Sequence, residues 1–373
     1  MESVDSGLVT LFLCGDVMLG RGVDQILPHP GRRQLQEQHV LDARDYVRLA
    51  ERAHGPVPRP ASFAWPWGDA LDILGQAAPA ARLVNLETSI THSTDFAPGK
   101  GVHYRMSPQN LPALAAARPD AIALANNHVL DFGRTGLLDT LAALTSAGLR
   151  PAGAGRDATQ ARQPALIPAP SGRILVFACG AVCSGIPRGW AATATRPGVW
   201  VLPALSDRSA DDVISRVLSV KQPGDMAVVS IHWGSNWGYQ VTDDQARFAR
   251  RLIDGGVDLI HGHSSHHPRP IQVYRGKLVL YGCGDCINDY EGIPGYEEFR
   301  GDLRLLYLAS VAAGTGELAA LQIVPMQARK MRLSRASAAD SDWMCRVLDR
   351  VSQGFGARIT RQPDGSLRLH AAA

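Results

Sequence analysis

Short apolar runs recur along the first 310 residues of the chain. Most contain Val, Ile and Leu without alternating polar positions, which is typical of strands covered on both faces. They span residues 8–14, 82–84, 121–124, 173–179, 226–231, 257–260 and 278–281. Between them, the apolar spacing predicts helices over 110–117, 137–147, 211–220 and 243–254. Strands that alternate with helices in this way predict a layered α/β fold.

Two segments lie outside this alternation. Residues 28–68 are rich in Pro, Arg, His and Trp and predict an irregular insertion that shapes a pocket at one end of the sheet. Near the C-terminus, a helix is expected over 339–352, followed by two short strands around the turn Gln362-Pro-Asp-Gly-Ser. We therefore expect one main domain over 8–330 and a C-terminal extension over 331–373.

Composition narrows the class of protein. The chain has 373 residues, of which 45% are hydrophobic, enough for a large core. Its net charge of +3 is small and its arginines are dispersed, so nucleic acid is not an expected partner. No apolar run approaches about 18 residues and the N-terminus lacks a signal pattern, so we expect a cytoplasmic protein without a membrane anchor. The six cysteines are scattered, and the unaccompanied pair Cys283-Gly-Asp-Cys286 is interpreted as structural.

Polar side chains follow five of the apolar runs. Because the carboxyl ends of strands in open α/β sheets converge on one edge, these side chains are expected to face one another. Asp, Glu, Asn and His together are typical ligands of a centre for two divalent ions. The residues are Asp16, Asn85, Glu87, Asn126, Asn127, His128, His232, His261 and His263, with His266 and His267 close behind.

Taken singly, most of these residues would be structural. A lone Asp before a turn is usually a cap, and a lone His at a strand end is usually hydrogen-bonded structure. Their recurrence in the same position favours a site. Arg21, Arg105 and Trp233 or Trp237 are the candidate substrate-binding residues of the pocket.

Six segments in order resemble the capsule-synthesis CapA family, also called poly-γ-glutamate synthesis proteins. The resemblance covers roughly residues 8–310. It implies a β-sandwich flanked by helices, related to the calcineurin-like metallophosphoesterases. The segments are GDVMLGR (15–21), VNLETSIT (84–91), LANNHVLDFG (124–133), GAG (153–155), SIHWGSNW (230–237) and HGHSSHHPRPIQVYRGKLVLYGCGDCINDYEGI (261–293).

The resemblance also implies roles for single residues in a centre with two divalent ions, which Mn, Zn, Fe, Co or Ca could fill. Asp16 corresponds to a ligand of the first ion, whereas Met18 stands where a histidine is usual, which puts the strength of that site in question. Glu87 is the expected bridging ligand in preference to Asn85, because an anionic oxygen bridges two cations better than an amide. Asn127 corresponds to a ligand of the second ion.

The histidines of the resemblance divide into catalytic and ligating groups. His128 is expected to act as an acid or oxyanion partner, together with Asp16 and His266 as catalytic residues. His232 and His263 correspond to metal ligands. The remaining ligand is His266, favoured by the spacing of the capsule branch, or His261. Asp131 and Asp285 are expected to orient ligand imidazoles, with structural capping as the alternative.

Three functions fit this pattern. The first expectation is a metal-dependent acid–base enzyme acting on a peptide, most concretely a Cα epimerase for the C-terminal residue of a ribosomal, lasso-type precursor. The first alternative is a dinuclear metallophosphoesterase or a capsule poly-γ-glutamate synthesis protein. The second is a non-catalytic subunit that binds an anionic polymer. In each case the expected partner is a peptide or another anionic ligand.

Overall fold

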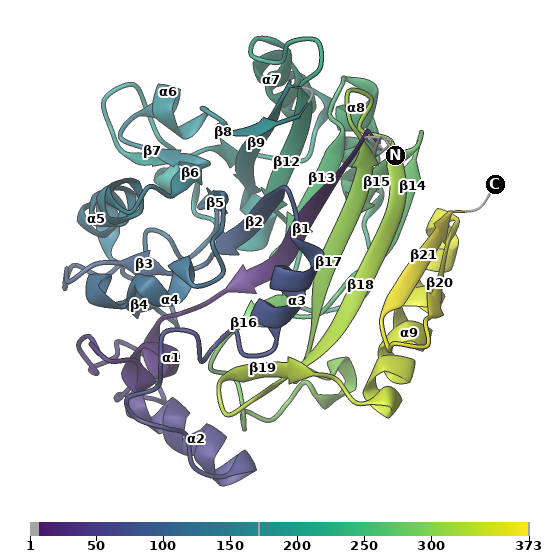
Figure 1. Ribbon diagram of the computed structural model, residues 1–373. Coiled ribbons are helices and arrows are strands. Elements are labelled where there is room, and N and C mark those ends of the chain that lie inside the picture. The colour runs from purple at the N-terminus through teal and green to yellow at the C-terminus, as the bar shows by residue number, and fades with distance from the viewer. Residues whose placement is uncertain (1–6, 171, 372–373) are drawn as a thin grey trace.

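Two large β-sheets form the centre of the molecule, with helices outside them (Figure 1). The structure is a computed structural model that describes residues 7–170 and 172–371. The ten-stranded sheet has the order β20 (Ala357–Arg361), β21 (Leu367–Ala371), β18 (Leu318–Arg329), β17 (Leu303–Ala312), β1 (Leu8–Val17), β2 (Ala81–Leu86), β5 (Ala121–Ala123) and β6 (Arg150–Ala152), with β16 (Asp285–Ile287) paired to β1 and β19 (Arg332–Arg335) paired to β18.

The second large sheet has seven strands. Its order is β11 (Val201–Leu202), β9 (Gly172–Ala181), β12 (Met226–His232), β13 (Leu259–His263), β15 (Lys277–Leu280) and β14 (Ile271–Tyr274), with β8 (Ala165–Ala169) paired to β9. Two small sheets pair β3 (Ser89–Ile90) with β4 (Arg105–Met106), and β7 (Ala154–Gly155) with β10 (Gly198–Val199).

The helices lie around these sheets. They are α1 (Arg21–Ile26), α2 (Arg44–His54), α3 (Ala70–Ala77), α4 (Pro112–Ala115), α5 (Gly133–Ser146), α6 (Ala158–Ala161), α7 (Asp207–Leu218), α8 (Asp243–Asp254) and α9 (Ala338–Ser352). Helix α8 begins where the sequence predicts, because Thr242 and Gln245 form a reciprocal capping box. Within the described ranges, no helix is both long and apolar enough to cross a membrane.

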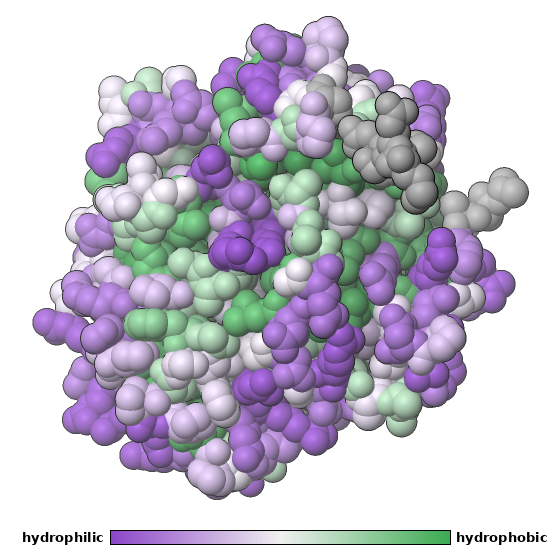
Figure 2. All heavy atoms as spheres, viewed as in Figure 1, coloured by the Kyte–Doolittle hydropathy of each residue, from purple (hydrophilic) through white to green (hydrophobic). Residues whose placement is uncertain are grey.

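Alternating residues of the seven-stranded sheet contribute to two cores. Val228 and Leu259 pack in a core shared with β1 and β2, whereas Val229 and Ile260 pack in a core shared with α7 and α8. A strand buried on both faces needs apolar side chains in both directions, which explains the runs without polar alternation. Hydrophobic residues reach the face shown in Figure 2 mainly in a central band, and the lower part of that face is mostly hydrophilic.

The structure confirms the mixed α/β class and corrects two local predictions. The segment 28–68 is not irregular throughout, because it contains α2, whose Tyr46 and Val47 are buried. The helix expected over 110–117 is reduced to the single turn α4. The chain cannot continue this helix, because Arg118 adopts φ 49° and precedes a proline.

Candidate metal centre

The carboxyl ends of strands from both large sheets meet at one edge of the sandwich. In the ten-stranded sheet, Asp16 at the end of β1 lies beside Asn85 of β2 and Asp285 of β16. In the seven-stranded sheet, His232 at the end of β12 lies beside His263 of β13. The local connection between the sheets includes the backbone N–H of Ser264, which donates to Asp16 Oδ2 at 3.3 Å.

One group of possible metal ligands joins Asp16 to His232 and His263. The ligand atoms of the three side chains lie within 4.8 Å of one another, and all three residues are buried. The Nδ1 atoms of His232 and His263 are 2.8 Å apart, and His263 Nδ1 is 3.8 Å from Asp16 Oδ1. Asn127 Oδ1 lies 3.0 Å from His232 Nε2, which places the predicted amide ligand at the border of this group.

A second group shares Asp16 and adds His266 and Asp285. These ligand atoms also lie within 4.8 Å of one another. His266 Nδ1 is 2.9 Å from Asp285 Oδ1, and Asp285 Oδ2 accepts a hydrogen bond from Asn288 at 2.6 Å. The sequence predicts that Asp285 orients a ligand imidazole or acts as a structural cap, but the structure places it among the possible ligands themselves.

Glu87 lies between the histidines of this edge. Its Oε1 is 3.7 Å from His128 Nε2 and 3.9 Å from His232 Nε2. Its Oε2 is buried without a hydrogen-bond partner among the described residues. Buried carboxylate oxygens are normally paired, so this free oxygen is available to a cation. Asn85, the alternative to Glu87, instead donates to Asp16 Oδ1 at 2.7 Å.

The charges of the site support the same interpretation. Burial, followed by the negative charge of neighbouring carboxylates, raises the pKa values of Asp16 and Glu87. Burial lowers the pKa values of His232 and His263, so these imidazoles are neutral. Neutral imidazoles beside crowded carboxylates form a suitable ligand set for a divalent cation, which would relieve the repulsion between the carboxylates. The residues present therefore fit a metal centre.

Two charged residues, Asp131 and Lys100, contact the Nδ1 side of the His128 ring. Its Nδ1 lies 2.6 Å from Asp131 Oδ2, and Lys100 donates to the other oxygen of Asp131. Burial lowers the pKa of His128 to about 4 despite the neighbouring carboxylate. Asp131 also accepts a hydrogen bond from the backbone N–H of Tyr104 at 2.7 Å, so the position of this carboxylate is fixed.

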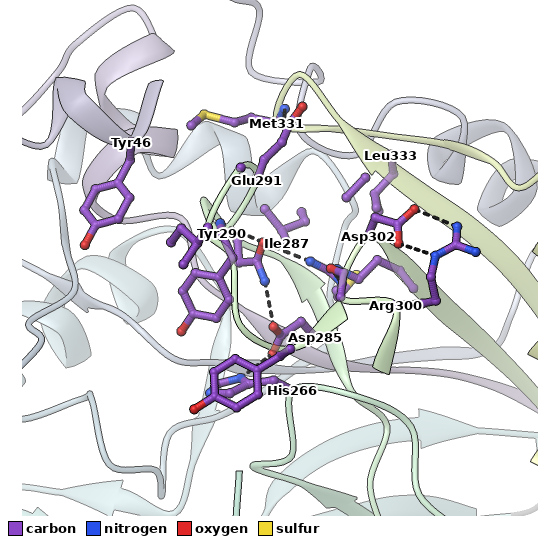
Figure 3. A pocket seen from close by; sticks show the side chains of 18 of the residues that line it. Tyr46, His266, Asp285, Ile287, Tyr290, Glu291, Arg300, Asp302, Met331 and Leu333 are labelled. Carbon is purple, nitrogen blue, oxygen red and sulfur yellow. Dashed lines mark hydrogen bonds and ion pairs between the residues drawn. The ribbon is translucent and has the colours of Figure 1, made fainter. Parts of the chain in front are cut away.

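A cavity of about 590 Å³ meets the centre at His266 and Asp285. Figure 3 shows these two side chains at one end of the cavity and Tyr46, Met331 and Leu333 at the other. The volume lies within the range of pockets that hold small ligands, on the order of 300–1,000 Å³. The cavity gives a ligand access to the second group, whereas His232 and His263 are buried behind it.

Some predicted residues lie elsewhere than expected. Trp233 is fully buried, stacks on Tyr281 and packs beside Phe248, so it belongs to the core and not to the pocket. Trp237, its alternative, does line the cavity. Arg105 lines a different, smaller hollow.

Two further candidates reach the area but are already bonded. Arg21 lines the cavity, yet its guanidinium is paired with Asp289 and Glu37. His261 lies deeper than the other histidines: its Nε2 donates to Cys14 O at 2.7 Å and its Nδ1 is 3.1 Å from Ser230 Oγ. Among the described residues, His261 belongs to neither ligand group, whereas His266 belongs to the second, which favours His266 as the remaining ligand.

Sequence reasoning missed several residues around the site. Lys100 comes from a loop far from any apolar run, and its contact with Asp131 depends on tertiary structure. Arg304 lies on β17 in the cavity wall, and its side chain donates to Asn288 Oδ1 at 2.9 Å. Met18, where the metallophosphoesterase pattern has a histidine, is buried, and its sulfur accepts a hydrogen bond from Tyr290 at 3.7 Å. Lys100 and Arg304 carry no sequence signal, whereas Met18 is already conspicuous in the sequence.

Comparison with known proteins gives a consistent set of matches. The family model described as bacterial capsule synthesis protein PGA_cap matches residues 10–290. A probable polyglutamine synthesis accessory protein of Mycobacterium tuberculosis is 53% identical over 368 residues, which covers 98% of this chain and 97% of that protein. The PGA biosynthesis protein CapA of Bacillus subtilis is 29% identical over 292 residues, which covers 78% of this chain and 66% of that protein. The capsule biosynthesis protein CapA of Bacillus anthracis is 24% identical over 285 residues, 75% of this chain and 60% of that protein.

Proposed function

The chain belongs to the bacterial capsule synthesis protein family, and from this premise we propose that it is a metal-dependent hydrolase that cleaves a poly-γ-glutamate chain during synthesis of that polymer. The observation that carries the proposal is the pair of ligand groups that share Asp16, the second of which meets the cavity through His266 and Asp285. Two divalent ions held there would acidify a bound water and polarise the oxygen of the scissile group.

The residues of the chain have separate roles in this reaction. Asp131 accepts a hydrogen bond from His128 Nδ1–H, so the lone pair of Nε2 is directed toward Glu87 and the centre. His128 Nε2 is then placed to take a proton from the attacking water and return it to the leaving nitrogen as the amide C–N bond breaks. His266 and Asp285 position the substrate end of the centre, because they face the cavity.

Arg304 is the candidate anchor for a carboxylate of the substrate inside the cavity. Its guanidinium donates to two backbone carbonyls and to Asn288, and it forms no ion pair with any described residue. Its Nε has no partner among those residues. A buried cation without an acidic partner is costly, so an anionic ligand would be stabilised beside it.

The names of the relatives favour this proposal over a peptide epimerase. Two of them are named for capsule or PGA biosynthesis and one for polyglutamine synthesis, and none is named for peptide epimerisation. The epimerase expectation therefore has no support beyond the presence of acid–base groups. Phosphoester hydrolysis remains the second candidate, because the strand-end ligands match the order of the metallophosphoesterase pattern. We also propose that the two sheets form a calcineurin-like sandwich, the fold in which that chemistry is usual.

The name of the mycobacterial relative, an accessory protein, favours a third possibility, a subunit that binds polymer without catalysis. Metal content and product analysis separate the three. Purified protein supplied with Mn²⁺ should shorten γ-linked glutamate oligomers, as measured by mass spectrometry, without releasing phosphate from p-nitrophenyl phosphate. Phosphate release alone would support the esterase. Less than one equivalent of bound metal with no product of either kind would support the binding subunit.

The matched variants are Glu87→Gln and Glu317→Gln. Both remove one carboxylate, but Glu317 is exposed and distant from the centre in the fold, on the turn before β18. Glu87→Gln should lower both metal content and cleavage, whereas Glu317→Gln should change neither. Equal metal content in the two variants would contradict a role for Glu87 as a ligand.

A further inference from the structure

A second hollow, of about 200 Å³, lies beside the cavity and shares Arg21 with it. We call it the arginine pocket, because Arg21, Arg32 and Arg105 all line it together with His103. Uncharged polar and apolar side chains complete the lining, and no carboxylate of the described residues contributes to it. A hollow of this volume suits one charged group and the few atoms bonded to it.

Two of the three arginines are free to bind an anion. Arg21 is paired with Glu37 and Asp289. Arg32 forms no ion pair with any described residue and is exposed. Arg105 is half-buried, donates one hydrogen bond to Ser93 O at 2.6 Å and lies over the ring of Phe132, which leaves its other donors available.

Two acidic residues, Asp24 and Glu37, lie near these arginines, and the charge of Asp24 only partly offsets the effect of Arg32 on Arg105. Asp24 accepts hydrogen bonds from the backbone of Ser107 and Gly31 and from the side chain of Asn110. Glu37 bonds to Arg21 and Tyr46. Burial, and then the charge of Arg32, lowers the pKa of Arg105, which is the effect of a partly desolvated cation beside a like charge. An anion between the two arginines would relieve that repulsion.

His103 adds a different kind of group. It is only 3% exposed, and its Nε2 lies 2.7 Å from Ala97 O. Because a carbonyl oxygen can only accept, Nε2 carries a proton, and the tautomer with its single proton there keeps a lone pair at Nδ1. That Nδ1 is buried without a partner among the described residues. The pocket therefore combines anion-binding donors with one unused acceptor, a combination that suits a ligand carrying both a carboxylate and an amide N–H.

The segment 103–105 forms the wall between the two hollows. His103 and Arg105 line the arginine pocket, whereas Tyr104 between them lines the cavity. Side chains of an extended segment alternate in direction, so one short stretch can serve both sides. The two hollows are therefore neighbours, separated by this segment and Arg21.

We propose that the arginine pocket binds one glutamyl unit of a polymer whose neighbouring units occupy the cavity. Arg32 and Arg105 bind its carboxylate, and His103 accepts a hydrogen bond from its amide N–H. The inference takes the identity of the ligand from the proposed function, and it adds a site outside the metal centre. Inorganic phosphate offers the same oxyanion chemistry but lacks the amide N–H.

Binding of a γ-linked glutamate pentamer and of inorganic phosphate, measured by calorimetry at fixed ionic strength, tests the proposal. The variants are Arg32→Gln, Arg105→Gln and their combination. The matched control is Arg33→Gln, because Arg33 is the exposed neighbour of Arg32 but pairs with Asp42 and does not line the pocket. Because the double variant loses the charge-assisted hydrogen bonds of both arginines, it should bind the pentamer about 10-fold or more weakly.

The expected result is a loss for the double variant, an affinity within about twofold of wild type for Arg33→Gln, and full metal content in both. Unchanged pentamer binding by the double variant would overturn the proposal, as would arginine-dependent binding of phosphate without binding of the pentamer. If Arg105→Gln fails to fold, Arg32→Gln alone decides, since Arg32 is exposed. Loss of cleavage with retained arginine-dependent binding would refute the proposed hydrolysis and leave this site standing.

Discussion

Asp16 connects the two ligand groups, since it is the one residue common to both. Its carboxylate has two oxygens, and each already has a defined neighbour: Asn85 donates to Oδ1 and the backbone of Ser264 donates to Oδ2. These bonds fix the orientation of the carboxylate before any ion arrives. A ligand that is held in this way loses little conformational freedom on binding, which raises affinity.

Replacing Asp131 with Asn tests how His128 is positioned. The amide keeps the size of the carboxylate but can present an N–H to His128 Nδ1, which favours the wrong tautomer. The substitution should lower kcat about 10- to 100-fold with little change in KM or metal content, since partners of this kind typically contribute that much. Steady-state kinetics and metal analysis on the same sample provide the check. Parallel losses of metal and activity would show that Asp131 supports the centre and not His128.

At the scale of elements, the site depends on the close approach of β1 and β16. A Cβ on Gly15 would lie 1.5 Å from the backbone oxygen of Gly284, so no larger residue fits. This contact sets Asp16 beside Asp285 in the parallel pairing of the two strands. A strand glycine at a close backbone approach is a feature that the sequence alone does not distinguish from a flexible turn.

Gly15→Ala should therefore separate the two strands and destabilise the protein by about 3 kcal/mol, as overpacked cores do. Metal affinity should fall with stability, because Asp16 and Asp285 move apart. Gly75→Ala is the control, since Gly75 lies within α3 with open space around its Cα. That change should leave metal binding intact and stabilise the helix by about 0.5–1 kcal/mol. Urea unfolding measures the stability of both variants. Equal stability of the two would contradict the role assigned to Gly15.

Asp302, directly before β17, is bonded to Arg300 and to Gln327 of β18, and it makes stability depend on pH. Burial alone would raise its pKa, but hydrogen bonds from Arg300 and Gln327 outweigh that effect and lower the pKa to about 2. A depressed pKa stabilises the folded state above the unfolded value of about 4, and this contribution is lost as pH falls toward 2.

Asp302→Asn should cost about 1 kcal/mol at pH 6, after allowance for solvent screening of this partly exposed pair. The difference from wild type should shrink as the pH is lowered from 4 toward 2. Urea midpoints at pH 6, 4 and 3 measure the trend. A difference that stays constant over this range would mean that the charge of Asp302 does not contribute.

At the scale of the molecule, the C-terminal segment belongs to the same core as the site. Strand β21 pairs with β18 of the larger sheet, and Met344 and Leu348 of α9 are buried in the core. Ser352 also accepts a hydrogen bond from the backbone of Ile271, which lies on the other sheet. This segment lies beyond the residues that the family model matches, yet it connects both sheets.

Deleting residues 336–373 should therefore lower the Tm by about 10 °C or more, because several buried apolar side chains lose their partners. Differential scanning calorimetry of the shortened chain gives the answer. A Tm within a few degrees of the full chain would show that the segment is an independent appendage.

The sequence predicted the centre better than its surroundings, for a physical reason. Strand ends are local features, so the position of Asp16, Glu87 and His232 at one edge followed from apolar runs and topology rules. The choice between His261 and His266 depended on depth in the sandwich, which a spacing pattern does not contain. The burial of Trp233 and the pairing of Arg21 depended on tertiary contacts in the same way.

The central proposal is that the two ligand groups that share Asp16 would each hold a divalent ion, and anomalous diffraction from crystals grown with Mn²⁺ tests it most directly. The account predicts two anomalous peaks, one beside His232 and His263 and one beside His266 and Asp285, each at coordination distance from Asp16. Crystals of Asp16→Asn should lose at least one of them. The absence of any peak at this edge in the wild-type protein, or peaks that persist unchanged in Asp16→Asn, would contradict the account.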